Sequence, residues 1–171
     1  RDLGAIVLQA ILGGVTVLLK LPTTVSISHA CLAQAVLSLL VVLSVATSKE
    51  WTDNRTMEAT TGEHRFKLNA PVIGTILIYI QLILGAVVRH TGLAMIPHMI
   101  GAGVVTLAVF WSSIGIIRHP ASAALRPLVW ASMALVVIQV LLGLTLYFVG
   151  RFISVTTVHV AVGALLLITM V

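Results

Sequence analysis

The sequence predicts an all-α membrane protein, and three of its features support this prediction. The chain of 171 residues is 59% hydrophobic and 9% charged, whereas about 25% of the residues in typical soluble domains are charged. Its mean hydropathy of +1.14 also indicates a lipid environment. The apolar residues are concentrated in six runs that lack the alternation of a strand. Since a helix in lipid satisfies its own backbone hydrogen bonds, we expect six transmembrane helices.

Each apolar run is long enough to cross the hydrocarbon layer as a helix, which takes roughly 17 to 25 residues. The predicted helices cover residues 3–19, 25–47, 70–88, 94–117, 127–149 and 153–171. The five prolines are predicted to lie in turns or first helical turns, where a missing N–H group costs little. They are Pro22, Pro71, Pro97, Pro120 and Pro127.

One long polar segment, residues 48–67, is predicted to be a cytoplasmic connector. It separates a first helix pair, residues 1–47, from a four-helix bundle, residues 68–171. The net charge of +5 does not predict a nucleic-acid partner, because the basic residues lie between apolar runs and follow a membrane topology. Most of the Lys and Arg residues fall on the N-terminal side of the membrane, which the positive-inside rule assigns to the cytoplasm.

Several function classes are disfavoured by what the apolar runs lack. Cys31 is the only cysteine, so this chain can form neither an internal disulfide nor a cysteine-based metal site. No acidic residue lies within the six runs, which argues against a proton or cation pathway built on carboxylates. The sequence also contains no glycine-rich phosphate loop and no nucleophile elbow.

A pattern of glutamine, glycine and histidine is repeated in three helix pairs. In each pair the glutamine on the first helix is followed four residues later by a glycine, and the histidine lies near the start of the second helix. The three sets are Gln9, Gly13 and His29; Gln81, Gly85 and His98; and Gln139, Gly143 and His159. This spacing predicts that all three histidines lie at one membrane level, near the outer ends of their helices.

An ionisable side chain inside a membrane is by default a candidate functional residue. Four residues after each histidine, on the same helical face, stands a small residue: Ala33, Ala102 or Gly163. We expect these residues to leave room for a flat macrocycle beside the imidazole, so that histidines on facing helices can bind one haem iron from both sides. Arg89, at the same level, either binds haem propionates or anchors its helix at the membrane surface.

A purely structural role for these residues is the alternative. Small residues line ordinary contacts between membrane helices, and histidine and glutamine can hydrogen-bond across such contacts. Interhelical hydrogen bonding is the favoured interpretation of the three glutamines, and contact with the edge of a cofactor is the other. For the histidines we favour ligand binding, because three of them share one position in three repeats.

The repeats contain longer motifs that resemble a known family. They are Gln9-Ala-Ile-Leu-Gly-Gly with His29-Ala-Cys-Leu-Ala-Gln34, Leu84-Gly-Ala-Val-Val-Arg-His-Thr-Gly92 with Pro97-His98, and Gln139-Val-Leu-Leu-Gly-Leu-Thr145 with Val158-His159. Together they resemble the haem A synthase family of cytochrome oxidase assembly proteins over nearly the whole chain. The resemblance implies two four-helix bundles in tandem. We expect this chain to be a fragment that lacks the first two helices and holds the second half of the N-terminal bundle and the complete C-terminal bundle.

The resemblance also implies an activity, the oxidation of a ring methyl group of haem O to a formyl group to give haem A. The implied cofactor is haem b, with its iron bound by His98 and His159, and His29 is the implied ligand of the substrate haem. The implied partners are haem O synthase and oxidase assembly factors in a bacterial cell membrane. The resemblance does not define the electron acceptor.

Two other functions are compatible with the same residues. A b-type cytochrome that passes electrons, for example from quinol, would use the same histidine pair without modifying a haem. A haem-free transporter or assembly scaffold would use the histidines as hydrogen-bonding groups between helices. The haem product distinguishes the first alternative from a haem A synthase, and the colour of the purified protein distinguishes the second.

Overall fold

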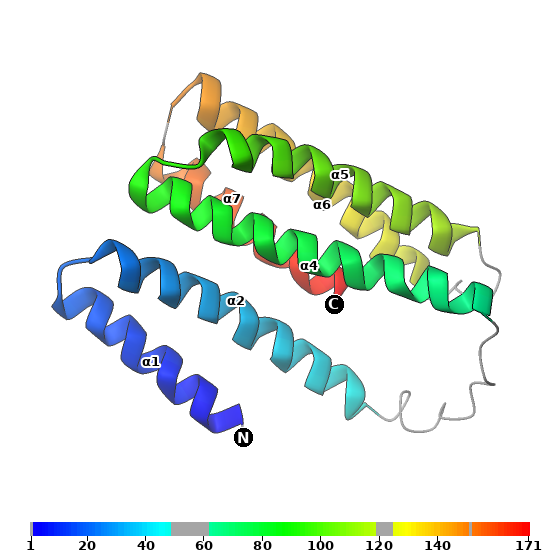
Figure 1. Cartoon of the computed structure of the whole chain (residues 1–171), viewed down its shortest axis with the longest axis horizontal. Coiled ribbons are helices and arrows are strands. Elements are labelled where there is room, and N and C mark those ends of the chain that lie inside the picture. Colours follow the sequence, from blue (N-terminus) through cyan, green and yellow to red (C-terminus); the bar gives the residue numbers. More distant parts are fainter. Residues whose placement is uncertain (1, 49–61, 119–124, 151) are drawn as a thin grey trace.

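The structure, a computed structural model, describes residues 2–48, 62–118, 125–150 and 152–171 (Figure 1). In these ranges the chain is built of helices and contains no strand. The helices are α1 (Asp2–Leu18), α2 (Thr23–Ala46), α4 (Gly62–Thr91), α5 (Met95–Ile117), α6 (Arg126–Phe148) and α7 (Ile153–Met170). Each of them contains one predicted apolar run to within a few residues, so the predicted all-α membrane fold is confirmed.

Five of these helices, α2 and α4 to α7, have the length and apolar character needed to cross a membrane. The exception is α1, which has 17 residues. At 1.5 Å per residue it is about 26 Å long, which is less than the hydrocarbon thickness of about 30 Å. The prediction of six full spans is therefore confirmed for five helices, and α1 is a shorter apolar helix.

The N-terminal end of α4 differs from the prediction. The helix begins at Gly62 rather than near residue 70, because Glu, Arg and Lys in this polar stretch are good helix formers. The predicted connector therefore ends earlier, and its residues 49–61 lie outside the described ranges. Pro71 consequently lies inside α4, and its predicted place in a first turn is wrong.

Of the other prolines, Pro22, Pro97 and Pro127 lie at helix starts as predicted. Pro120 lies outside the described residues. At a helix start the missing N–H group has no partner to lose.

Short turns join the helices into antiparallel pairs, and all of these turns lie at the same end of the molecule (Figure 1). Each contains backbone in the left-handed region, where glycine is free of the penalty that a β-carbon brings. The left-handed residues are Lys20 (φ 56°) and Leu21 (φ 64°), Gly92 (φ 73°) and Ala94 (φ 62°), and Gly150 (φ 118°). Because each turn is tight, the start of the second helix of a pair lies beside the end of the first.

Helices α4 to α7 form a closed four-helix bundle. Each packs against the next, and α7 packs back against α4. The helices α5 and α7 are diagonal to one another, with no pair of Cα atoms within 8 Å in the described residues. Side chains from all four helices fill the core: Ile78, Val105, Val109, Val136, Leu166 and Leu167.

The first helix pair lies outside this bundle. Helix α2 packs against α4 and α7, whereas α1 packs, among the described helices, against α2 alone. Large apolar side chains cover the outside of the molecule, among them Leu18 (81% exposed), Leu107 (73%) and Phe148 (76%). These exposures would be unfavourable in water and are expected for side chains that face lipid.

Three serines on α5 and α6, Ser112, Ser113 and Ser132, are almost completely buried. Small residues let membrane helices approach closely. We predict that Ser132→Leu destabilises the bundle by about 1–3 kcal/mol, because the larger side chain overpacks the contact. The measurement is the thermal unfolding of the purified protein in detergent. Ala134→Leu adds the same side chain at an exposed position of α6 and should leave Tm unchanged; equal losses in both variants would contradict this packing.

Candidate functional site

Gln81 on α4 contacts His98, which lies near the start of α5. The amide Nε2 of Gln81 donates a hydrogen bond of 2.7 Å to the backbone oxygen of His98 and lies 3.0 Å from ring atom Nδ1. Both side chains are half-buried. The predicted interhelical hydrogen bond of this glutamine is therefore confirmed.

In the other two repeats the glutamine also contacts the histidine. In one it reaches the other ring nitrogen, and in the other it reaches only the backbone oxygen. Gln139 on α6 places its Nε2 3.4 Å from Nε2 of His159 on α7. Gln9 on α1 donates from Nε2 to the backbone oxygen of His29 on α2, over 3.2 Å. The three glutamines thus occupy equivalent places, but each approaches its histidine differently.

The glycine that follows each glutamine lies directly beneath the histidine ring. A β-carbon added to Gly85 would lie 3.2 Å from the nearest ring atom of its histidine, and the corresponding distances are 3.4 Å at Gly143 and 3.0 Å at Gly13. The distances at Gly13 and Gly85 are shorter than most real β-carbon contacts, and the one at Gly143 is close to ordinary van der Waals contact. The glycines therefore allow each imidazole to lie against the backbone of the preceding helix.

In the α4–α5 and α6–α7 pairs the second helix also has a glycine, which lies beside the glutamine amide of the first helix. A β-carbon added to Gly101 on α5 would overlap Oε1 of Gln81, and one added to Gly163 on α7 would lie 3.0 Å from Nε2 of Gln139. Glutamine amides thus occupy the space beside these two glycines, and the expectation that small residues after the histidines leave room for a macrocycle stays a prediction. In the central repeat the contact residue is Gly101 and not Ala102, whose place in the pattern suggested the role.

His98 and His159 come together inside the bundle. Their ring centroids are 6.5 Å apart with an angle of 72° between the ring planes. An imidazole nitrogen lies about 2.0–2.1 Å from a first-row metal ion such as zinc, so two imidazoles on opposite sides of one metal have ring centres about 6 Å apart. The observed spacing would allow both imidazoles to hold one metal ion between the diagonal helices α5 and α7.

The unused ring nitrogens support the same interpretation. Nδ1 of His159 and Nδ1 of His29 are buried and have no hydrogen-bond partner. A buried polar atom without a partner costs about 1–3 kcal/mol, and such an atom in a native site requires an explanation. A bound metal would satisfy the His159 nitrogen, so the donor atoms of the pair fit a haem iron.

His29 does not join the other two histidines. No group of three or more His, Cys, Asp or Glu side chains that could hold a bare metal ion is present in the described ranges. His29 belongs to α2, which packs on the outside of the four-helix bundle. The predicted metal ligands thus divide into one pair, His98 with His159, and one separate histidine.

Arg89, the predicted propionate ligand, is an exposed residue in the last turn of α4. It lies next to the turn that joins α4 to α5, the helix that carries His98 near its start. This position allows contact with an anionic group at the rim of the bundle, and it equally allows the anchoring role.

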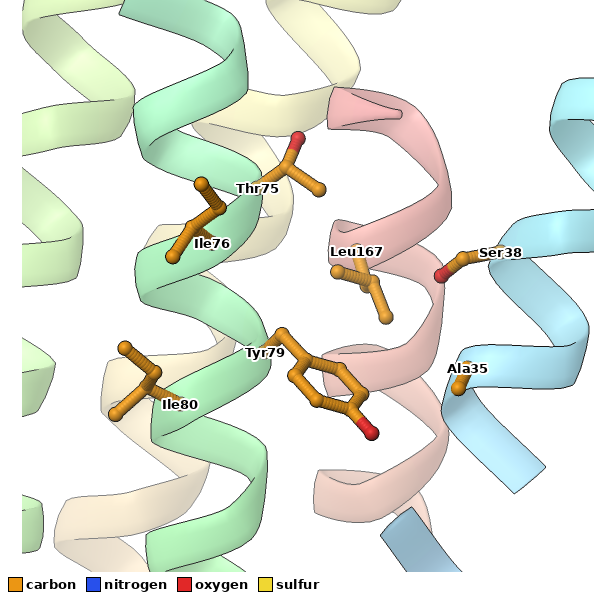
Figure 2. Close-up of a pocket in the computed structure, with 7 residues that line it drawn as sticks. All are labelled: Ala35, Ser38, Thr75, Ile76, Tyr79, Ile80 and Leu167. Atoms are coloured by element: carbon orange, nitrogen blue, oxygen red, sulfur yellow. The ribbon is translucent and has the colours of Figure 1, made fainter. Parts of the chain in front are cut away.

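A cavity of about 300 Å³ lies between α2, α4 and α7, and the sequence did not predict it. Figure 2 shows its lining, in which Ala35 and Ser38 of α2 face Tyr79 of α4 and Leu167 of α7. Thr75 donates to the backbone oxygen of Met170 (2.8 Å).

Tyr79 donates to the backbone oxygen of Cys31 (3.0 Å) and so connects the first helix pair to the bundle. The signal that could have found these contacts is the spacing of two hydroxyl groups, Thr75 and Tyr79, four residues apart in an apolar run.

The fold and the site define a class: an integral membrane protein with several spans and a pair of histidines near one end of a four-helix bundle. Comparison with models of protein families finds no match. Comparisons with curated proteins and with solved structures also find none.

We predict that Gly101→Val disturbs this site, because its side chain would displace the amide of Gln81. Overpacking of this kind typically costs about 1–3 kcal/mol, and the measurement is Tm in detergent. Gly103→Val is the matched control on the same helix, since a β-carbon there meets nothing within 4 Å. A loss of stability in the Gly103 variant alone would contradict the contact.

Proposed function

We propose that this chain binds a b-type haem through His98 and His159 and acts as a haem A synthase-type oxidoreductase. One observation supports the haem site above all others: two imidazoles on diagonal helices lie with ring centroids 6.5 Å apart. The oxidation of haem O to haem A is proposed from the sequence motifs around the same histidines.

The chain's own residues provide the conditions for haem binding. His98 and His159 would hold the iron from opposite sides, and the glycines at 85 and 143 allow both rings to approach the backbone. The core of the same bundle is apolar, and both histidines are half-buried. A bound haem b supplies one-electron transfer, which the protein tunes through axial ligands and burial.

His29 is proposed as a ligand of the haem that is oxidised. The support is its equivalent environment: a glycine beneath the ring, a glutamine on the preceding helix and a buried nitrogen without a partner. The cytoplasmic side of the bacterial cell membrane is proposed for the N-terminal face, since basic residues are concentrated there. The histidines then lie toward the outer side.

A b-type cytochrome is the second candidate, and the asymmetry of the site favours it. His98 and His159 face one another within a closed bundle, whereas His29 has no ring contact with another imidazole in the described part of the chain. Electron transfer alone needs only the paired histidines. Quinol-linked transfer without haem modification would therefore use a smaller part of the chain.

We predict that His159→Ala abolishes the low-spin b-type spectrum of the full chain purified with haem b, because one axial ligand is lost. His98→Ala should have the same effect. Absorption and electron paramagnetic resonance spectra of the reduced and oxidised protein provide the measurement. His90→Ala, which removes a histidine of α4 that has no ring contact with the pair in the described residues, is the control and should retain the spectrum. An unchanged spectrum in the His159 variant, or a colourless wild-type protein, would contradict the haem site.

The modified product distinguishes the two candidates. Expressed in cells that make haem O but lack their own haem A synthase, the full chain should yield haem A in extracted haem if the proposal is right. Chromatography of the extracted haems provides the measurement. Haem b bound to the protein without any haem A would identify it as an electron-transferring cytochrome.

A further inference from the structure

The glutamine amides determine which nitrogen of each imidazole is free. Gln81 lies against Nδ1 of His98 and leaves Nε2. Gln139 lies against Nε2 of His159 and leaves Nδ1, which is buried without a partner. The two rings that face each other are therefore held by opposite nitrogens. Each ring would offer the other nitrogen toward a ligand.

Both amides are confined by the backbone behind them. The amide of Gln81 occupies the place that a β-carbon on Gly101 would take, and the amide of Gln139 lies beside the corresponding place at Gly163. A second hydrogen bond, to the backbone oxygen of His98, further fixes the amide of Gln81. Neither amide can move away from its ring without losing a close contact.

Each amide also has an oxygen atom, Oε1, that accepts no hydrogen bond. The Oε1 atoms of Gln81 and Gln139 are buried and have no hydrogen-bond partner. An imidazole that binds a metal through one nitrogen carries its proton on the other, and this N–H group needs an acceptor that orients the ring. A half-turn of the amide exchanges its nitrogen and oxygen and presents Oε1 to that N–H group. At Gln81 this turn gives up the hydrogen bond to the backbone oxygen of His98.

We propose that Gln81 and Gln139 are positioning residues that set the orientation and the tautomer of His98 and His159. In the free protein the amide N–H donates to one ring nitrogen, and the ring proton stays on the other. With a metal on the free nitrogen, the single ring proton would lie on the nitrogen beside the amide, and Oε1 would accept a hydrogen bond from that N–H group. This second state rests on the proposed haem function, whereas the first does not.

The free state is tested by nuclear magnetic resonance of the full chain with ¹⁵N-labelled histidine, in detergent and without haem. We expect His98 to be protonated on Nε2 and His159 on Nδ1, which are opposite tautomers in one protein. Gln81→Met keeps the length of the side chain but removes the amide, and should convert the ring of His98 alone to a mixture of tautomers. Gln139→Met should do the same for His159.

The control is Gln34→Met, which replaces another half-buried glutamine, on α2, outside the two pairs. It should change neither ring. The same tautomer in both histidines, or tautomers that the Gln81 and Gln139 variants leave unchanged, would overturn the proposal.

The metal-bound state is tested by titrating the same proteins with haem b. We expect Gln81→Met to weaken haem binding about 10- to 100-fold, the usual effect of removing a group that orients a metal ligand. Gln81→Glu keeps an oxygen acceptor and should restore binding to near the wild-type level. Equal losses in the Met and Glu variants would overturn the acceptor role. If the wild-type protein binds no haem, the proposed function fails, and the tautomer measurement alone decides the role of the glutamines.

Discussion

The structure depends on contacts between polar side chains that lie half-buried among apolar residues. Glutamine and histidine are costly to bury alone in an apolar medium, and within this bundle each repeat supplies both. The 2.7 Å hydrogen bond from Gln81 to the backbone of His98, with the ring nitrogen 3.0 Å away, is the clearest case. These contacts join α4 to α5 near the turn, and the equivalent contact joins α6 to α7.

Glycine makes this pairing reciprocal. Gly85 of α4 accommodates the imidazole of His98, and Gly101 of α5 accommodates the amide of Gln81. Each helix therefore has a glycine at the point where the other helix inserts a side chain. Because the arrangement is repeated at Gly143 and Gly163, the two helix pairs present their histidines at matching depth. Closing the four helices into one bundle then brings the two rings to 6.5 Å across its diagonal.

The first helix pair shows that the contact between glutamine, glycine and histidine does not by itself bring two histidines together. Gln9, Gly13 and His29 make the same kind of contact, yet α1 and α2 lie outside the closed bundle and are joined to it through Tyr79 and the packing of α2. A histidine environment is thus a property of one helix pair, whereas a pair of facing histidines requires two. Haem ligation by His98 and His159 is proposed on that difference.

The sequence by itself determined the helices and the place of each histidine near the start of its helix, because apolar length and the distance from a tight turn are local properties. The sequence analysis was wrong about the start of α4 and about Pro71. The helix begins in a polar stretch, ahead of the apolar run from which it was predicted. Only the tertiary structure decided that Gly101 and Gly163 receive glutamine amides, and which ring nitrogens remain free. Those features depend on how helices far apart in sequence pack and rotate against one another, and single-chain periodicity contains no information about that rotation.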